Sequence, residues 1–212
     1  MTKKTGTKKT STKKTTKKDS LSAKKQEIRN QVMANIDKIP QPERGEMEKA
    51  IDLNFLTKVP AFKKAKIIAA FYPLPHEVSI LQLIKKVSKA GKRVCLPVID
   101  GKKKPLTFKE YKFGDSLAYD KEYKIIYEPL EKAKEVTPDL VIVPLFAFDE
   151  TGTRVGTGHG YYDRTIEALR AKKKDVVTVG IAYSFQEFDD LPKGEHDQVL
   201  DFVVTDKKVH SF

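Results

Sequence analysis

The chain has 212 residues, of which 39% are hydrophobic and 33% charged, so it holds enough apolar material for one domain, or two small ones, around a core. Collagen-like, membrane-embedded and wholly disordered classes are therefore excluded. The longest apolar run, 140–148, is interrupted by Pro144 and is far shorter than the roughly 20 residues of a transmembrane helix, and no apolar stretch follows the basic N-terminus as in a secretory signal. One cysteine, Cys95, excludes an intramolecular disulfide and a cysteine zinc cluster. We expect a cytoplasmic protein with no membrane partner.

The net charge of +12 is concentrated at the N-terminus. Residues 1–20 contain eight lysines and one acid, a net charge of +7, whereas residues 21–212 contain 33 basic and 28 acidic residues, a net charge of +5. Because the Lys/Thr-rich segment has almost no apolar surface to bury, we predict a disordered tail over 1–20 and a single domain over 21–212. The tail is either a solvated leader or a polycation that makes weak, salt-sensitive contacts with RNA or anionic lipid. It contains no aromatic residue for base stacking, so no specific nucleic-acid partner is expected.

The domain shows alternating helical and strand patterns. A helix is expected from Ser20 or Ser22 to about Lys38, with apolar side chains at i, i+4 and i+8. The further elements expected in chain order are a helix over 43–56, a strand over 66–72, a helix over 78–90, strands over 93–99, 106–111 and 140–144, a helix over 161–173, and strands over 176–182 and 202–205. Val- and Ile-rich strands between amphipathic helices predict an α/β fold with three layers, in which a mainly parallel, Rossmann-like sheet has helices on both faces.

Ligands of open α/β sheets bind at the carboxyl ends of the strands, so the loops that follow them are the candidate sites. In the first such loop, 72–77, two prolines stiffen the chain and present the carboxylate of Glu77 just before a helix. Glu77 is either a ligand contact or a favourable charge at the helix N-terminus.

The second loop has glycine at every second position over 156–160 and Arg154 shortly before them. Glycines let phosphates approach the backbone, the following helix offers free N–H groups, and guanidinium binds phosphate in a bidentate manner. The pattern is neither the dinucleotide fingerprint nor a Walker loop, and a plain tight turn remains an alternative.

Polar side chains around these glycines suggest further roles. Asp163 and, in the third loop (191–197), Asp197 are candidate magnesium ligands, because magnesium is commonly held by one or two carboxylates and substrate phosphates. Asp163 is alternatively a favourable charge in the first turn of the following helix. His159 is either a general base or a packing residue. Of Tyr161 and Tyr162, one is expected in the core and the other on a pocket wall.

Motifs over nearly the whole of 21–212 resemble those of the 5-formyltetrahydrofolate cyclo-ligase family. The matching residues are Lys25-x-x-x-Arg29, Tyr72-x-Pro-x-x-Glu77-Val78, Gly91-Lys92-Arg93-Val94 with Leu96-Pro97, 139–144, 147–149, Arg154 with the GTGHGYYDR run to Arg164, 179–182, 191–192 and His196-Asp197. The run over 139–164 is the most specific. Thr157, His159 and the pair 145–146 depart from the family pattern.

This resemblance implies a ligase of one-carbon metabolism that closes 5-formyltetrahydrofolate to 5,10-methenyltetrahydrofolate, with ATP as co-substrate and Mg²⁺ as cofactor. Phosphorylation of the formyl oxygen would precede attack by N10, and ADP and phosphate would be released. The resemblance implies catalytic roles for Arg154, Tyr161 and Asp163, and magnesium binding by Asp163 and Asp197. ATP would contact Lys25, Arg29, Arg154, Gly156, Thr157, Gly158, His159, Gly160, Tyr161 and Tyr162. The folate would contact Tyr72, Glu77, Thr157, Gly158, His159, Gly160 and Tyr161.

Two alternatives remain open at this point. A sugar-phosphate isomerase or acyl-CoA transferase relative has a related α/β layout with glycine-rich phosphate loops, although Arg154, Asp163 and Asp197 favour ATP. An RNA-associated protein would derive its function from the tail, and the lack of aromatic residues there argues against sequence-specific recognition.

Overall fold

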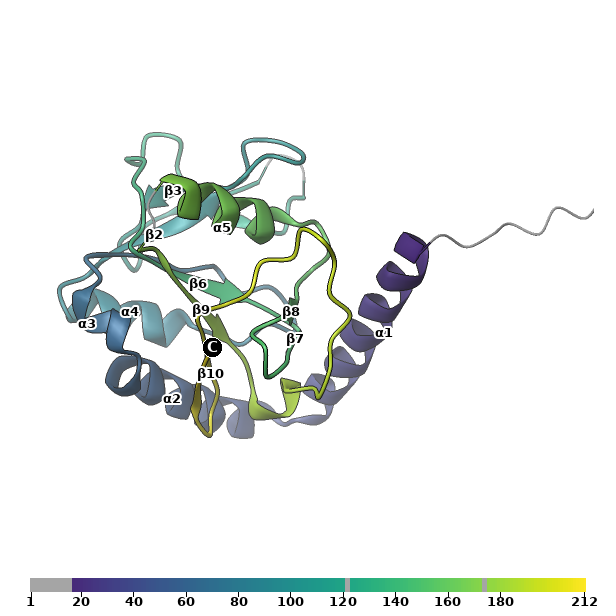
Figure 1. Cartoon of the computed structure of the whole chain (residues 1–212). Coiled ribbons are helices and arrows are strands. Elements are labelled where there is room, and N and C mark those ends of the chain that lie inside the picture. The colour runs from purple at the N-terminus through teal and green to yellow at the C-terminus, as the bar shows by residue number, and fades with distance from the viewer. Residues whose placement is uncertain (1–16, 121–122, 173–174) are drawn as a thin grey trace, which may run out of the picture.

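A computed structural model describes the backbone of residues 17–120, 123–172 and 175–212 (Figure 1). Its helices are α1 (Lys17–Lys38), α2 (Gln41–Lys58), α3 (Pro60–Lys64), α4 (Leu81–Lys89), α5 (Tyr161–Lys172) and a 3-10 turn, η1 (Ser184–Gln186). Its strands are β1 (Ile67–Ala69), β2 (Arg93–Val98), β3 (Thr107–Glu110), β4 (Leu117–Tyr119), β5 (Tyr127–Pro129), β6 (Leu140–Pro144), β7 (Ala147–Phe148), β8 (Arg154–Val155), β9 (Val177–Ile181), β10 (Phe202–Val204) and β11 (Val209–Ser211).

The central sheet has seven strands in the order β11-β10-β9-β6-β1-β2-β3. Its inner neighbours all pair in parallel, and only the outermost strands, β3 and β11, pair antiparallel. Two small antiparallel pairs, β4-β5 and β7-β8, lie outside it. The predicted α/β class with a mainly parallel sheet is confirmed.

Helices cover both faces of this sheet, as the unbroken apolar strands require. In β6, Leu140 and Ile142 pack in the core that holds Phe55 of α2 and Leu83 of α4, while Val141 packs in a second core with α5. Figure 1 shows α5 on one side of the sheet and α2 to α4 on the other. The three-layer arrangement is therefore confirmed.

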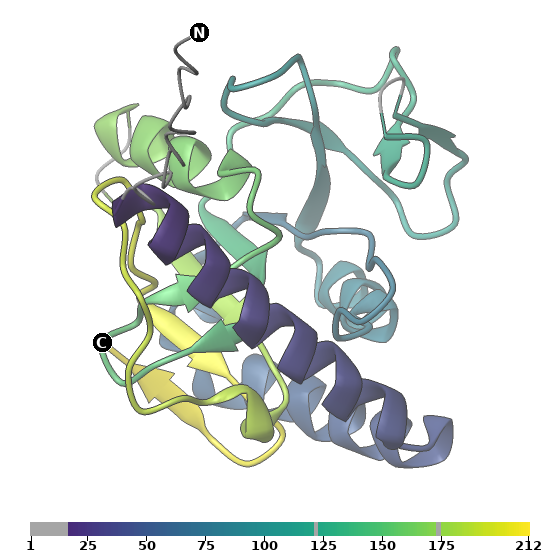
Figure 2. The same cartoon turned by 90° about the vertical axis from the view of Figure 1, so that its right-hand side faces the viewer.

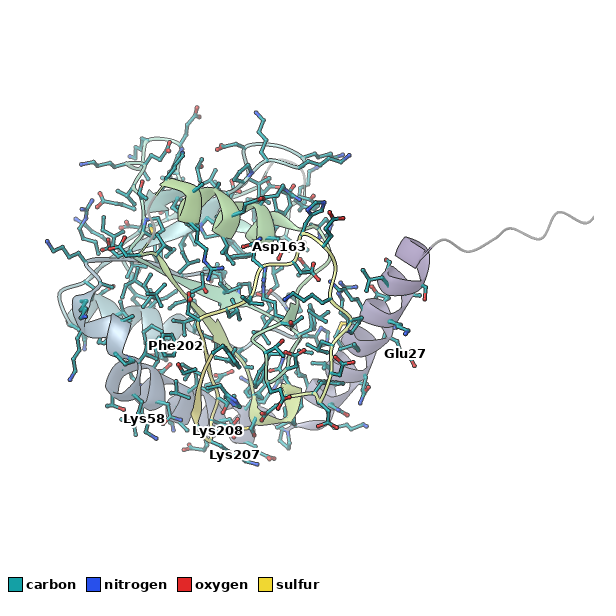
Figure 3. The ribbon with its side chains drawn as sticks, viewed as in Figure 1. Glu27, Lys58, Asp163, Phe202, Lys207 and Lys208 are labelled. Carbon is teal, nitrogen blue, oxygen red and sulfur yellow. The ribbon has the colours of Figure 1, made fainter. Side chains whose placement is uncertain are left out.

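Helix α1 lies across the end of the sheet at which the parallel strands finish. It runs along that side of the molecule in Figure 1 and crosses it diagonally in Figure 2. Its inward stripe includes Ile36, Val32 and Arg29, which are buried, whereas Glu27 points away from the domain (Figure 3). The helix therefore presents basic as well as apolar side chains to the carboxyl edge of the sheet.

Three helices begin at other residues than expected, and one of them, α2, begins two residues early, at Gln41. Helix α1 begins at Lys17, before Ser20 and Ser22, because no proline or glycine interrupts this stretch; residues 1–16 of the predicted tail lie outside the described residues. Helix α4 begins at Leu81 and not at Val78, since the Ser79 N–H donates a hydrogen bond to the Glu48 side chain and does not join a helical turn. The elements α3, β4, β5, β7, β8 and β11 were not predicted, because runs of two to five residues carry too little periodicity.

The single cysteine lies inside the fold. Cys95 in β2 is fully buried, and its thiol donates a hydrogen bond to the Ile68 carbonyl oxygen with an Sγ to O distance of 3.6 Å. Burial raises the pKa of this thiol far above its ordinary value. Within the described part of the chain, no helix combines the length and apolar character that a membrane crossing needs.

Gly180 in β9 leaves no room for a side chain. A Cβ there would lie 2.7 Å from side-chain carbons of Leu145 and Leu200 and 2.9 Å from one of Val203. Gly180→Ala should therefore destabilise the fold by about 1–3 kcal/mol through overpacking, measured by urea denaturation. Gly45→Ala in α2 is the matched control, because its Cβ meets nothing within 4 Å; it should be neutral or stabilise by about 0.5–1 kcal/mol. Equal stability of the two variants would contradict the crowding at β9.

Candidate active site

A cavity of about 590 Å³ lies at the carboxyl edge of the sheet, within the size range of small-molecule sites. Its wall is formed by α1, by the segments after β1, β2 and β6, by the glycine loop and by the start of α5. Every predicted site residue lies on this wall, namely Lys25, Arg29, Tyr72, Glu77, Arg154, Gly156, Thr157, Gly158, His159, Gly160, Tyr161, Tyr162, Asp163 and Asp197. The fold thus brings the three loops together around one space.

The strand order explains this location. From β1 the chain passes through α4 to β2 on one side, and β6 later returns on the other side of β1. Adjacent parallel strands whose connections leave in opposite directions open a crevice at their carboxyl ends. Tyr72, after β1, and Pro144, at the end of β6, both line the cavity.

Arg29 holds the glycine loop. Its Nε donates a hydrogen bond to the carbonyl oxygen of Gly156 at 2.7 Å, and its Nη1 donates to Gln26 at 3.0 Å. Gly158, with φ of +95°, lies directly against this guanidinium, since a Cβ at Gly158 would be 3.1 Å from Nη2. Nη2 donates to no described residue, so it is the part of the guanidinium that can still bind an anion.

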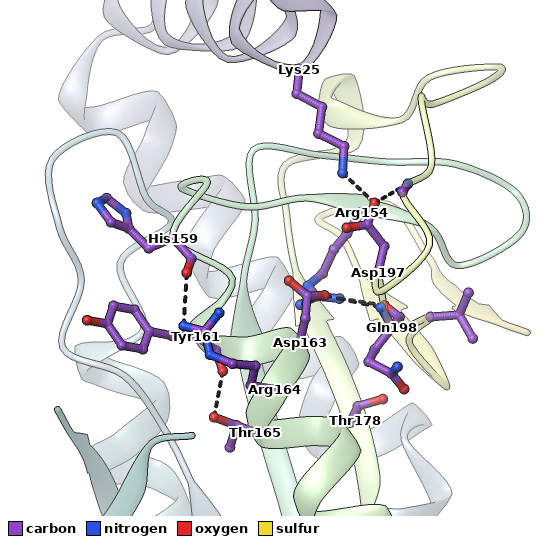
Figure 4. A network of polar contacts seen from close by, with 12 residues as sticks. Lys25, Arg154, His159, Tyr161, Asp163, Arg164, Thr165, Thr178, Asp197 and Gln198 are labelled. Atoms are coloured by element: carbon purple, nitrogen blue, oxygen red, sulfur yellow. Dashed lines mark hydrogen bonds and ion pairs between the residues drawn. The ribbon is translucent and has the colours of Figure 1, made fainter. Parts of the chain in front are cut away.

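Arg154 and Asp163 form a buried ion pair at the start of α5 (Figure 4). The guanidinium Nη2 donates to Asp163 Oδ1 at 2.8 Å, and Nη1 donates to the carbonyl oxygen of Gln198. The Gln198 N–H donates to the same carboxylate oxygen at 3.1 Å. The Arg154 side chain is only 4% exposed, so its charge acts in a low-dielectric surrounding.

A second ion pair joins α1 to the loop before β10. The Lys25 ammonium donates to Asp197 Oδ2, which also accepts the Gly194 N–H at 2.7 Å (Figure 4). Burial is the largest single influence on the pKa of Asp197 and raises it, but the hydrogen bonds from Lys25 and Gly194 and the charge of Arg154 together lower it below its ordinary value. Asp197 therefore stays ionised.

The two aspartates fit a magnesium ion that also contacts phosphates. In both ion pairs one carboxylate oxygen takes all of the hydrogen bonds, which leaves Asp163 Oδ2 and Asp197 Oδ1 without a donor among the described residues. No group of three or more Asp, Glu, His or Cys side chains with metal-binding geometry occurs in the described ranges. Hard oxygen ligands in small number suit Mg²⁺, which completes its octahedron with water and phosphate.

Glu77 lies on the same cavity wall, in the turn after β1. Its carboxylate accepts the Leu74 N–H at 2.9 Å. Burial raises the pKa of Glu77 to about 7, and the hydrogen bond from Leu74 opposes this shift. Glu77 precedes Leu81, the first residue of α4, by four positions and lies outside its first turn, so the alternative of a helix-terminal charge is wrong.

Aromatic side chains line the same cavity as Glu77, and some of them were not predicted. Tyr72 packs on Tyr127 of β5, with ring centroids 4.6 Å apart, and Tyr127 and Ile126 line the cavity. Tyr162 is partly buried on the same wall; burial raises its pKa, the Glu77 charge adds to the increase and Arg154 opposes it. Its hydroxyl forms no hydrogen bond with a described residue, and the charges of both Glu77 and Arg154 act on it.

His159 packs among aromatic rings. Its ring is edge-on to Tyr123, at 5.4 Å, and stacked with Tyr161, at 6.2 Å between centroids. The hydroxyls of Tyr123 and Tyr161 are 3.2 Å apart, and the Arg164 guanidinium lies over the Tyr161 ring. No described carboxylate pairs with His159, so the packing interpretation is favoured over the general base.

Comparison with known proteins identifies this arrangement. A sequence model described as the 5-formyltetrahydrofolate cyclo-ligase family matches residues 21–206. The chain belongs to this family. The resemblance seen in the motifs is thereby confirmed, and the matched range includes every cavity residue named above.

Relatives of this cyclo-ligase cover most of its length. It is 36% identical to the 5-formyltetrahydrofolate cyclo-ligase of Escherichia coli K12 over 71% of this chain and 83% of that protein. It is 31% identical to the Haemophilus influenzae enzyme of the same name over 84% and 95% of the two chains. The NMR structure of Aquifex aeolicus 5,10-methenyltetrahydrofolate synthetase superposes with a TM-score of 0.73 at 32% identity, covering 88% of this chain and 92% of that one.

The cavity wall also contains residues that were not predicted as site residues from the sequence. They are Leu21, Ser22, Gln26, Phe71, Leu74, Pro97, Ile99, Leu106, Ile126, Tyr127, Pro144, Leu145 and Phe146. Most of them are apolar residues that also fit a core interpretation. Ile126 and Tyr127 are apolar residues in a charged stretch, and this contrast was the one sequence feature that could have indicated an apolar part of the cavity wall.

Gly158→Ala should weaken nucleotide binding by about tenfold, because an L-residue at φ of +95° is strained by roughly 1–2 kcal/mol and its Cβ displaces Arg29. Calorimetric titration with a non-hydrolysable ATP analogue and magnesium measures this. Gly114→Ala is the control, since Gly114 has φ of +97° but lies outside the cavity, and its Cβ meets nothing within 4 Å. That variant should lose stability and keep its nucleotide affinity; an equal loss of affinity in both would refute the role of the Arg29 contact.

Proposed function

We propose that this cyclo-ligase closes the ring of 5-formyltetrahydrofolate in a reaction that requires ATP and magnesium. Family membership gives the conversion of 5-formyltetrahydrofolate to 5,10-methenyltetrahydrofolate. The use of ATP, the requirement for magnesium and the chemical steps are proposed in addition to this conversion. The supporting observation is one cavity whose lining combines cationic side chains and a glycine loop with Glu77 and the Tyr72 and Tyr127 rings, two sets of residues called its two halves below.

The cationic half suits the triphosphate. Lys25, Arg29 and Arg154 converge on the loop over 156–162, whose glycines allow a close approach to the backbone. In the proposal these groups bind the phosphates, and Asp163 and Asp197 hold magnesium. When bound, magnesium neutralises charge on the phosphates.

The other half suits the folate. Glu77 can accept hydrogen bonds, and the Tyr72 and Tyr127 rings on the same cavity wall offer flat apolar faces to a pterin. The segment over 157–161 lies on the same cavity wall. Nucleotide and folate would therefore meet there, near Tyr161.

The formyl oxygen attacks the γ-phosphorus, the bond from that phosphorus to the bridging oxygen breaks, and ADP leaves. N10 then attacks the activated formyl carbon, the carbon–oxygen bond breaks, phosphate leaves with the former formyl oxygen, and the N10 proton passes to solvent. Arg154 and Lys25 orient the transferred group and stabilise its charge, so the protein contributes mainly by positioning and electrostatics.

The test is an absorbance assay of the purified chain with 5-formyltetrahydrofolate, ATP and Mg²⁺ that follows the near-ultraviolet band of the conjugated product. We expect a rise that disappears when ATP is omitted or EDTA is added. Product formation without magnesium would overturn the metal assignment and leave the cyclisation itself in place. The activity is assigned to residues 21–212, with the Lys/Thr-rich tail accessory. Disorder was predicted over 1–20, but residues 17–20 belong to α1. For residues 1–16, which lie outside the described residues, disorder remains a prediction from the sequence, as does a cytoplasmic location of the protein.

A further inference from the structure

Both candidate metal ligands are paired with the side chains that the proposed function assigns to phosphate. Lys25 binds Asp197, and Arg154 binds Asp163 (Figure 4). Exposed fractions of 14% and 20% for the first pair and 4% and 23% for the second show that water screens these charges only partly. The two cations and two carboxylates thus neutralise each other in the arrangement that the structure shows.

A phosphate that enters this cavity competes with a carboxylate for each cation. If Lys25 turns to a phosphate, Asp197 loses its ammonium partner and keeps a negative charge close to the added negative charge. The same holds for Asp163 when Arg154 turns. Binding of nucleotide without metal would thus replace two ion pairs by two carboxylates that have no cationic partner. This exchange is unfavourable, because a partly buried charge without a partner is costly.

We propose that Asp163 and Asp197 exclude metal-free nucleotide and so make the site selective for the magnesium complex. This inference rests on the proposed function. A divalent cation brought with the phosphates binds the oxygens left without donors, Asp163 Oδ2 and Asp197 Oδ1, and replaces the partners that the carboxylates lose. Nucleotide and metal affinities are then positively coupled, each raising the other by the same factor.

The two basic residues contribute unequally to this exchange. Arg154 donates one further hydrogen bond, to the Gln198 carbonyl oxygen, and its side chain is almost fully buried, so its guanidinium can share Asp163 with a ligand while staying in place. Lys25 is a single ammonium on a flexible stem at the surface of α1, and Asp197 is the hydrogen-bond partner that the structure gives it. Asp197 accordingly disfavours the binding of metal-free nucleotide more strongly than Asp163 does.

The test is calorimetric titration of the full chain with AMP-PNP, a non-hydrolysable ATP analogue, in EDTA and in magnesium. We expect magnesium to raise the affinity of the wild-type chain by 30-fold or more. Asp197→Asn and Asp163→Asn should bind the metal-free analogue about 5–10-fold more tightly than wild type, and their gain from magnesium should fall below about fivefold. Removal of an acidic side chain thus improves metal-free binding and reduces the coupling.

Asp190→Asn controls for net charge, because Asp190 is exposed and lies outside the cavity. It should match wild type in both buffers. If both site variants bind the metal-free analogue no better than Asp190→Asn, the selectivity role is overturned while ATP binding stands. Absence of wild-type binding even with magnesium would overturn the proposed use of ATP itself. Asparagine keeps the hydrogen-bond acceptor, and the two site variants lie on different segments, so a folding defect in one leaves the other to decide.

Discussion

Asp163→Asn should lower kcat by two to three orders of magnitude. Asparagine can still accept the hydrogen bonds from Arg154 at 2.8 Å and from the Gln198 N–H at 3.1 Å, so the local geometry is kept while the negative charge is lost. That charge is proposed to hold magnesium against the transferred phosphoryl group, where an electrostatic contact typically contributes a factor of 100 to 1,000. Steady-state kinetics with both substrates saturating and magnesium varied measures the effect.

Glu167→Gln provides the matched control on the same helix. Glu167 lies one turn after Asp163 but is exposed and does not line the cavity, so its substitution should leave kcat unchanged. Normal turnover of Asp163→Asn at limiting magnesium would remove Asp163 from the metal site. A similar loss in Glu167→Gln would point to the N-terminal charge of α5 and not to the cavity.

Glu77→Gln should raise the KM for 5-formyltetrahydrofolate by about 30- to 100-fold and leave the KM for ATP nearly unchanged. A carboxylate accepts two N–H groups of a pterin at once, whereas an amide presents one acceptor and one donor and leaves a buried partner unsatisfied. Calorimetric titrations with folate and AMP-PNP separate the two affinities. Loss of nucleotide affinity with intact folate affinity would show that Glu77 contacts the nucleotide and not the folate.

The pKa of Glu77 adds a pH signature to this variant. Because the pKa is raised from 4.5 to about 7, folate affinity of the wild-type chain should rise as pH increases through 7, and that of Glu77→Gln should be flat. Between these two values the folded chain holds a proton that the unfolded chain releases, so Glu77 lowers the folding stability as pH rises across this window. At pH 8 Glu77→Gln should therefore be more stable than wild type by about 1–2 kcal/mol in urea denaturation. Equal stability at pH 8 would show that Glu77 ionises without cost.

The sequence allowed the glycine loop and its neighbours to be predicted because their chemistry is local. Alternate glycines over 156–160, with Arg154 before them and Asp163 after them, form a phosphate-binding pattern within ten residues. The parallel sheet was equally accessible, since β6 reads as four buried apolar residues in succession. In both cases neighbours in the chain carry the signal.

What could not be predicted depends on contacts between distant segments. The pair of Lys25 and Asp197 joins positions 172 residues apart, and no periodicity reports it. The pairing of Arg154 with Asp163, by contrast, spans only nine residues, but it depends on the conformation of the glycine loop between them, which the pattern does not specify. The contribution of Tyr127 to the cavity wall was not predicted, because β5 is only three residues long. The role of the Tyr127 ring becomes evident only from its contact with Tyr72.

Because the thiol of Cys95 is buried and unreactive, a spectroscopic label can be attached to a single introduced cysteine in this chain. Fully buried and with a strongly raised pKa, Cys95 offers no thiolate to a maleimide reagent in the folded protein. A cysteine introduced at an exposed position such as Ala118 of β4 would then be the one reactive sulfur, without any need to remove the native residue. A fluorophore attached there would report on the strand pair that carries Tyr127 while substrates bind.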